Sequence, residues 1–309
     1  MTTNPKKRAH PEHPHDSSSS KRRRDLEVRA IPIPAGAHHP AVPHDQILPQ
    51  HEFTMGVIAP KGSGKTTWLA NVLNFYTGYF NNIIVFSPTI HSDEKWEYVR
   101  KRPLLGENKA LKRFMEKHKK GDNPVVEGKS VVDDNNKKFD PHIPEDCFMA
   151  EYDEDTLREI MKQQDEAIEE VQKLGGTKHV CNRMLLIFDD LVGSKLFSGA
   201  RANPFKVLNI RHRHLSASIM MVSQAYKELP KTVRTNFTGM IVFEIPSEGE
   251  LNAIYTEYPV SLKRELWDQA YQFCVGDEFG FMYINTVRPK QLRIMKNFDQ
   301  FVFVENEEN

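Results

Sequence analysis

The segment Ala59-Pro-Lys-Gly-Ser-Gly-Lys-Thr66 constrains the fold more than any other part of this 309-residue chain. It follows the apolar run 53–59, which predicts a buried strand, and it leads into 66–80, which predicts a helix. Its two glycines let the backbone curl, so that successive N–H groups point into one concavity. The helix adds its positive N-terminal end. Together these features predict a phosphate-binding loop.

Each residue of this loop has an expected role. Lys65 is expected to reach the β- and γ-phosphates of a nucleotide, and the Thr66 hydroxyl to coordinate Mg²⁺. The motif usually begins with glycine, where this chain has Ala59, and a positive φ would be costly for alanine. The residues predicted to bind nucleotide are Ala59, Pro60, Lys61, Gly62, Ser63, Gly64, Lys65, Thr66 and Thr67.

A pair of acids follows the apolar run 184–188, which also predicts a buried strand. Parallel strands bring such acids to the carboxyl edge of the sheet, beside the phosphate loop. Asp189 is expected to hold Mg²⁺, through water, and Asp190 to orient the attacking water. Hydrolytic motors more often place Glu at the second position, so the shorter Asp190 requires the water to sit closer. The alternative is a strand end with solvated acids.

One amide and three arginines are further candidates for the same site. Gln224 ends a third buried strand, where it can hydrogen-bond both the water and the γ-phosphate and so report the nucleotide state. Arg234 is a candidate arginine finger, supplied to a neighbouring subunit. Arg211 and Arg213 are weaker candidates for that role. The alternative is that these arginines complement a helix C-terminus or bind surface acids.

Strands and helices alternate along the chain from residue 51 onward. This alternation predicts an α/β fold with a mostly parallel sheet covered by helices on both faces. A helix over 155–174 is expected to start with a capping box of Thr156 and Glu159. The last two strands, 281–286 and 291–295, are expected to form a hairpin. The other predicted strands are 83–86, 184–188, 219–223 and 240–245.

The charge balance is neutral overall, with 42 basic and 42 acidic residues, but it is segregated along the chain. Residues 1–24 hold seven Lys or Arg and two acids, a net charge of +5. Their clusters 6–8 and 21–24 resemble a bipartite nuclear-localisation signal for an import receptor; the alternative is a tail that binds polyanions. The predicted organisation is a disordered tail and Pro-rich linker over 1–50, an ATPase domain over 51–300 with a polar insertion at 91–145, and an acidic end at 301–309.

Composition excludes several other classes of protein. The chain has no apolar run of about 18 residues, so a membrane-spanning helix is not expected. Its three scattered cysteines favour a reducing intracellular compartment and argue against a disulfide scaffold or a zinc finger. Histidines such as His38, His39 and His51 show no metal-ligand spacing and are expected to be solvated. The absence of an Asn-Lys-x-Asp sequence favours ATP over GTP.

The ordered set of motifs resembles the FtsK/HerA superfamily of P-loop NTPases. Within that superfamily it resembles the poxvirus-type DNA-packaging ATPases of large DNA viruses and virus-like transposons. The resemblance covers about 50–300. It is carried by Phe86-Ser-Pro-Thr89, by Asp189-Asp190-Leu191, by Arg211-His212 before the strand that closes on Gln224, and by the stretch from Leu229-Pro230 to Arg234-Thr-Asn236.

The resemblance implies a RecA-like core, a ring of identical subunits, and ATP-driven threading of double-stranded DNA into a preformed capsid. It implies a capsid or portal-like partner and a location in the host nucleus or at a virion assembly site. By the same resemblance Lys65, Asp190, Gln224 and Arg234 are catalytic, and Thr66 and Asp189 hold the metal. The alternatives are a replication or transposition ATPase or helicase, and a nucleotide-gated binding protein with little turnover.

Overall fold

The computed structural model describes residues 39–119, 138–191, 193–197, 203–258 and 262–303. All of them belong to one compact unit, 38–309, which is separate from the unit formed by 1–37. The predicted import signal, most of the proline-rich linker and most of the acidic end lie outside the described residues.

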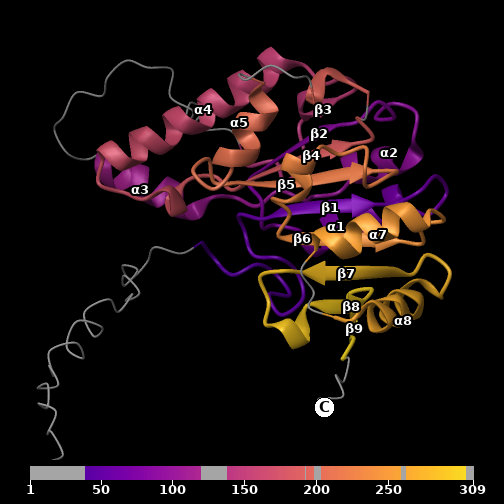
Figure 1. Ribbon diagram of the computed structural model, residues 1–309. Coiled ribbons are helices and arrows are strands. Elements are labelled where there is room, and N and C mark those ends of the chain that lie inside the picture. Colours follow the sequence, from indigo (N-terminus) through magenta and orange to yellow (C-terminus); the bar gives the residue numbers. More distant parts are fainter. Residues whose placement is uncertain (1–38, 120–137, 192, 198–202, 259–261, 304–309) are drawn as a thin grey trace, which may run out of the picture. The chain divides into compact units, whose positions relative to one another are not determined.

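The described residues form a nine-stranded sheet with the strand order β3-β2-β4-β5-β1-β6-β7-β8-β9 (Figure 1). The first six strands in the chain run parallel and the last three antiparallel, which confirms the predicted mostly parallel sheet and the terminal hairpin. The parallel strands are β1 (Thr54–Ile58), β2 (Asn82–Phe86), β3 (Phe148–Met149), β4 (Met184–Asp189), β5 (Ala217–Ser223) and β6 (Gly239–Phe243). The antiparallel strands are β7 (Phe281–Asn285), β8 (Ile294–Lys296) and β9 (Gln300–Phe301).

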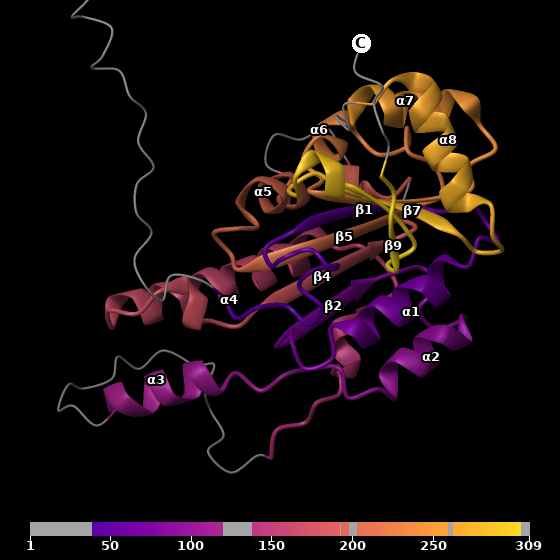
Figure 2. The same ribbon diagram turned by 90° about the horizontal axis from the view of Figure 1, so that it is seen from below.

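Helices cover both faces of the sheet (Figure 2). On one face lie α1 (Lys65–Phe75) and α2 (Glu94–Arg100). On the other lie α4 (Glu154–Lys173), α5 (Pro204–Arg211), α6 (Lys231–Arg234), α7 (Glu248–Glu257) and α8 (Arg264–Val275). Strand β5 is buried on both sides because its side chains alternate, with Ile219 facing the second group and Met220 the first. Within the described ranges, no helix is both long and apolar enough to cross a membrane.

Two helix boundaries differ from those expected. Helix α1 ends at Phe75 rather than residue 80, because the chain turns at once through Gly78, whose φ is +75°. Helix α4 begins with Asp153 as its cap, and the Asp153 carboxylate accepts the Thr156 N–H at 2.8 Å. The predicted capping box was therefore wrong: Thr156 occupies the third helical position, where its N–H needs the acceptor that Asp153 supplies.

The charge-rich segment 91–145 is not simply a polar insertion. It contains α2, whose Trp96 and Val99 are buried against the sheet-facing core, together with Leu104 and Ile143. The exposed face of this short helix carries the charges, which hid its apolar side from a reading of composition. The predicted second helix of the segment exists as α3 (Lys109–Lys119), which packs Leu111 and Phe114 against the C-terminal half of α4.

The histidines near the start of β1 are buried rather than solvated, which corrects the expectation from sequence. His51 Nδ1 lies 2.7 Å from Ser218 Oγ, and His51 Nε2 lies 3.2 Å from Ser216 Oγ. Both serines belong to the start of β5 or to the turn before it. His51 therefore fastens the beginning of β1 to the beginning of β5.

A second layer of contacts surrounds this histidine. His39 Nε2 lies 3.1 Å from Glu52 Oε1, and the Lys178 ammonium donates to the same oxygen at 2.7 Å. The ligand atoms of His39, His51 and Glu52 lie within 4.8 Å of one another, as in a metal site. Since Lys178 already neutralises Glu52, this group is best described as a hydrogen-bonded cluster.

Burial lowers the pKa of His51 well below its ordinary value, and burial also lowers the pKa of His212. As the pH falls below about 6.5, the unfolded chain takes up protons that the folded His51 refuses, so the free energy of unfolding decreases. Thermal melts between pH 7.5 and 5.5 should therefore show a smaller fall in Tm for His51→Gln than for wild type. The exposed His214→Gln variant should keep the wild-type slope, and an unchanged slope for His51→Gln would contradict the account.

Candidate active site

The loop between β1 and α1 has the curled conformation that the sequence predicts. Gly62 and Gly64 both have a φ of +85°, the left-handed region that favours glycine. The Ala59 N–H donates to the Ser223 carbonyl at 3.0 Å, so Ala59 extends the pairing of β1 with β5. Ala59 does not adopt a positive φ, which is why alanine is tolerated at this position. The Ser63 hydroxyl closes the loop by donating to the Pro60 carbonyl at 2.7 Å.

The beginning of α1 is open to an anion. The helix is capped by the backbone of Gly64, without a side-chain hydrogen bond and without an acid in the first turn. The first-turn N–H groups, which belong to Lys65, Thr66 and Thr67, therefore receive no side-chain cap. Together with the helix dipole they fit a phosphate group. The Thr66 side chain belongs to this turn and is 9% exposed.

The Lys65 side chain faces the two acids at the end of β4. Its Nζ lies 2.9 Å from Asp190 Oδ2 and 3.8 Å from Asp189 Oδ1. The sheet order places β5 between β1 and β4, so Lys65 spans the carboxyl end of β5 to reach them. The ammonium is buried and, among the described residues, its partners are these two carboxylates. The structure thus brings together the lysine and the acids that the sequence predicts to meet.

Asp189 is 2% exposed and its carboxylate is held by a neighbouring strand. The Ser87 hydroxyl, directly after β2, donates to Asp189 Oδ2 at 2.8 Å, and Thr89 Oγ1 lies 3.1 Å from Ser87 Oγ. Burial raises the pKa of Asp189, and the nearby Lys65 ammonium and the Ser87 hydrogen bond oppose that rise. A buried carboxylate of this kind gains from a bound cation, so Asp189 and Thr66 fit the predicted metal role.

The role of Ser87 was missed from the sequence. The motif Phe86-Ser-Pro-Thr89 was used only as part of the resemblance. The available signal was a polar residue immediately after a buried strand, and the pairing of β2 with β4 turns that position toward Asp189.

Asp190 is held in an unusual backbone conformation. Its φ is +55°, the left-handed region that few residues other than glycine adopt, and its N–H donates to the Val222 carbonyl at 3.0 Å. The Gln224 amide donates to Asp190 Oδ2 at 2.7 Å, the same oxygen that Lys65 contacts. An open cavity of about 800 Å³ reaches Asp190, with Tyr152 and Lys195 in its wall. Solvent can therefore approach Asp190 from the side away from Lys65.

Arg234 lies in a different environment from the one expected. The residue is 9% exposed, its Nη2 lies 3.3 Å from Glu257 Oε1, and its guanidinium stacks 4.5 Å above the Tyr226 ring. The Tyr226 hydroxyl donates to the same carboxylate at 2.8 Å. In this structure Arg234 therefore joins α6 to α7 instead of projecting from the surface, and its role as a finger stays a prediction.

The two weaker arginine candidates are both exposed. Arg211 pairs with Asp165 of α4 at 3.0 Å, which matches the surface ion pair considered as the alternative, and Arg213 lies in the turn after α5. Both are more accessible to a neighbouring molecule than Arg234 is.

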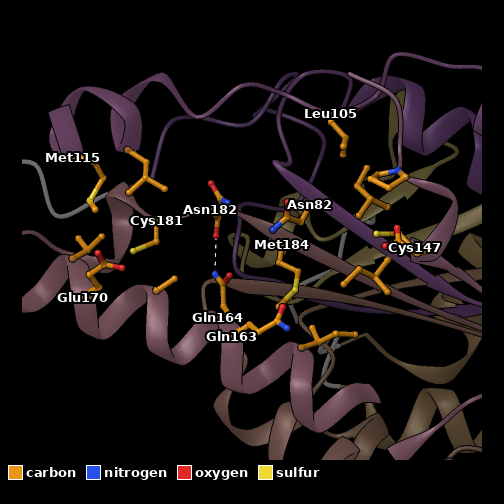
Figure 3. Close-up of a pocket in the computed structure, with 18 of the residues that line it drawn as sticks. Asn82, Leu105, Met115, Cys147, Gln163, Gln164, Glu170, Cys181, Asn182 and Met184 are labelled. Carbon is orange, nitrogen blue, oxygen red and sulfur yellow. Dashed lines mark hydrogen bonds between the residues drawn. The ribbon is translucent and has the colours of Figure 1, made fainter. Parts of the chain in front are cut away.

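A second cavity lies away from this site. It has a volume of about 390 Å³ and lies between α3, α4 and the start of β2 (Figure 3). Leu111 and Met115 of α3 line it from one side, and Gln164, whose amide donates to the Asn182 carbonyl at 2.9 Å, lines it from the other. None of its lining residues belongs to the phosphate loop or the acid pair, so the chemistry is not located there.

Removing the charge of Asp189 should stabilise the empty protein. Because the folded-state pKa of Asp189 is raised, ionising it opposes folding at every pH above the ordinary range of Asp. Asp189→Asn should therefore raise Tm at pH 7.5, and the gain should shrink as the pH falls and wild-type Asp189 takes up its proton. The exposed Asp299→Asn variant should leave Tm unchanged. A lower Tm for Asp189→Asn at pH 7.5 would contradict this.

Comparison with known proteins gives one family match and one sequence relative. The family model described as "Poxvirus A32 protein" matches residues 131–274, which confirms the predicted resemblance and includes Asp189, Asp190 and Gln224. The relative, "Uncharacterized protein 075L" of Invertebrate iridescent virus 6, is 25% identical over 163 residues. That alignment covers 52% of this chain and 59% of the relative, so the chain spans less than two thirds of it.

Two solved structures are similar to the described fold. The genome packaging NTPase B204 from Sulfolobus turreted icosahedral virus 2, in complex with ATP-gammaS, is 12% identical, with a TM-score of 0.45; the match covers 80% of this chain and 98% of that one. EssC (ATPases 2 and 3) from Geobacillus thermodenitrificans is 11% identical, with a TM-score of 0.43, and the match covers 84% of this chain and 41% of that one.

Proposed function

We propose that this chain, which carries the poxvirus A32 family match over residues 131–274, is an ATP-hydrolysing translocase that packages double-stranded viral DNA into capsids. The observation that carries the proposal is the convergence of Lys65 on Asp189 and Asp190 beside an uncapped helix N-terminus. These groups supply the anion cradle, the cation and the paired carboxylates that phosphoryl transfer requires.

The loop and Lys65 bind and orient the substrate. The first-turn N–H groups of α1 receive the phosphates, and the Lys65 ammonium exchanges its contact with Asp190 for one with a phosphate oxygen. Thr66 and Asp189 would hold Mg²⁺, which neutralises charge on the phosphate oxygens when it is bound. Ser87 keeps the Asp189 carboxylate oriented for that role.

Asp190 and Gln224 act on the attacking water. Once Lys65 turns to the substrate, Asp190 keeps its hydrogen bond from Gln224 and gains a free carboxylate oxygen that can accept a water proton. The cavity at Asp190 is lined mainly by acids, namely Glu151, Asp153, Glu154 and Asp155. This negative wall repels phosphate and leaves a path for water, which separates the two reactants before they meet.

DNA contacts are proposed for the outer face of α3. Lys112, Arg113 and Lys117 are exposed there, opposite the apolar side that packs on α4, and they can neutralise phosphates along a duplex. The side chains of Lys119 and Lys120 lie outside what the structure describes. The alternative for these charges is a solvated helix face.

Assembly and location form the least direct part of the proposal. A ring of subunits around DNA and a capsid or portal-like partner follow from the packaging activity. Delivery to the host nucleus by an import receptor, or action at a virion assembly site, rests on the basic clusters at 6–8 and 21–24.

The function is tested by measuring ATP hydrolysis with and without double-stranded DNA. Wild type should hydrolyse ATP, and DNA should raise the rate. Lys65→Ala should lower the rate at least about 100-fold, because it removes a preorganised partner of the transferred phosphoryl group. Lys95→Ala, an exposed lysine on α2, should retain the wild-type rate.

Other outcomes identify the alternatives. A rate that is indifferent to DNA would contradict the packaging motor. Separation of strands without any dependence on capsids would favour a replication or transposition helicase. Nucleotide binding without hydrolysis would favour a nucleotide-gated binding protein.

A further inference from the structure

Phe279 is an exposed aromatic residue beside the phosphate loop. It lies in the short connection between α8 and β7, and 60% of the residue is exposed to solvent. A Cβ atom built on Gly64 would lie 3.1 Å from Phe279 Cδ1, so the ring contacts the loop at the position that starts α1. None of the contacts described above for the catalytic groups involves this ring.

The backbone holds Phe279 in a conformation that phenylalanine rarely adopts. Its φ is +60°, which is an outlier for a bulky side chain. The turn is fixed from outside: the Gly280 N–H donates to the Asp277 carbonyl at 2.9 Å, and the Phe281 N–H donates to Asn297 Oδ1 at 3.1 Å. A Cβ at Gly280 would lie 2.7 Å from the Cys274 carbonyl oxygen, so only glycine fits there. Strain of this kind persists where the surroundings over-determine it, and it is concentrated at ligand sites.

The strand order places the ring on the opposite side of the loop from the acids. The sequence across the sheet is β4, β5, β1, β6, β7. Asp189 ends β4, the phosphate loop follows β1, and Phe279 stands just before β7. Phe243 of β6 pairs with Phe281 of the antiparallel β7, so Phe279 lies at the same carboxyl edge of the sheet as the acids.

This arrangement fixes the direction of a bound nucleotide. If the γ-phosphate lies where Lys65 meets the acids, then the nucleoside leaves the loop at the other end of the phosphate chain, toward β7. The flat apolar ring of Phe279 stands on that side with most of its surface free. Aromatic rings stack on any nucleobase, because every base presents a π-face.

We propose that Phe279 is the platform on which the base of ATP stacks, which makes it a binding residue for the nucleoside part of the substrate. The inference rests on the proposed function, since it requires the triphosphate to lie on the phosphate loop. It also gives the strained turn a purpose, because a relaxed backbone at this residue would not hold the ring against Gly64.

The test compares a ligand that has a base with one that lacks it. The full-length protein is titrated, in the presence of Mg²⁺, with ATPγS and with inorganic tripolyphosphate. Phe279→Ala should weaken ATPγS binding about tenfold, the size of one lost base stack. Its affinity for tripolyphosphate should stay within about twofold of wild type, because the phosphate contacts are kept. Phe279→Tyr, which retains the ring, should bind ATPγS as wild type does.

Two further variants make the result independent of folding. Phe75→Ala removes another exposed ring, 42% exposed, at the far end of α1 and should change neither affinity. Phe279→Trp places a fluorophore at the proposed platform, and its emission should respond to ATPγS and not to tripolyphosphate.

The inference is overturned if Phe279→Ala binds ATPγS as tightly as wild type. It is also overturned if the variant loses both ligands equally, since the ring would then support the loop rather than the base. A wild-type protein that binds neither ligand would instead overturn the proposed function, and this inference with it.

Discussion

The ion pair of Lys65 with the acids that end β4 is the interaction on which the site depends. A lysine that follows β1 can meet Asp189 and Asp190 only if β4, β5 and β1 run parallel with their carboxyl ends level, as the register of the sheet ensures. The buried hydrophobic faces of these strands hold that register, because a slip of one residue would turn apolar side chains outward. The core therefore acts as the ruler for the site.

The site is also where the protein departs from comfortable chemistry. Asp189 is an acid buried at the end of an apolar strand, Asp190 has a left-handed backbone, and Phe279 combines a left-handed backbone with an exposed ring. Each of these features opposes folding or solubility, and they border the same loop. A triphosphate with its cation and base would satisfy all three, which gives one explanation for three separate irregularities.

Local patterns in the sequence predicted the loop, the acid strand, the parallel sheet and the site of Gln224, because each is encoded by a few adjacent residues. What escaped prediction depends on contacts between distant residues. Ser87 meets Asp189 across 102 positions, and His51 meets Ser218 across 167. The partner of Arg234 on α7 has no local signal either, and an exposed phenylalanine becomes informative only when the fold places it against the loop.

The most direct test of the account is an experimental structure of the protein bound to ATPγS and Mg²⁺. The account predicts that the triphosphate lies over the first-turn N–H groups of α1, and that Lys65 has left Asp190 to contact a phosphate. It would be contradicted by a nucleotide bound elsewhere on the chain while the Lys65–Asp190 pair stays intact.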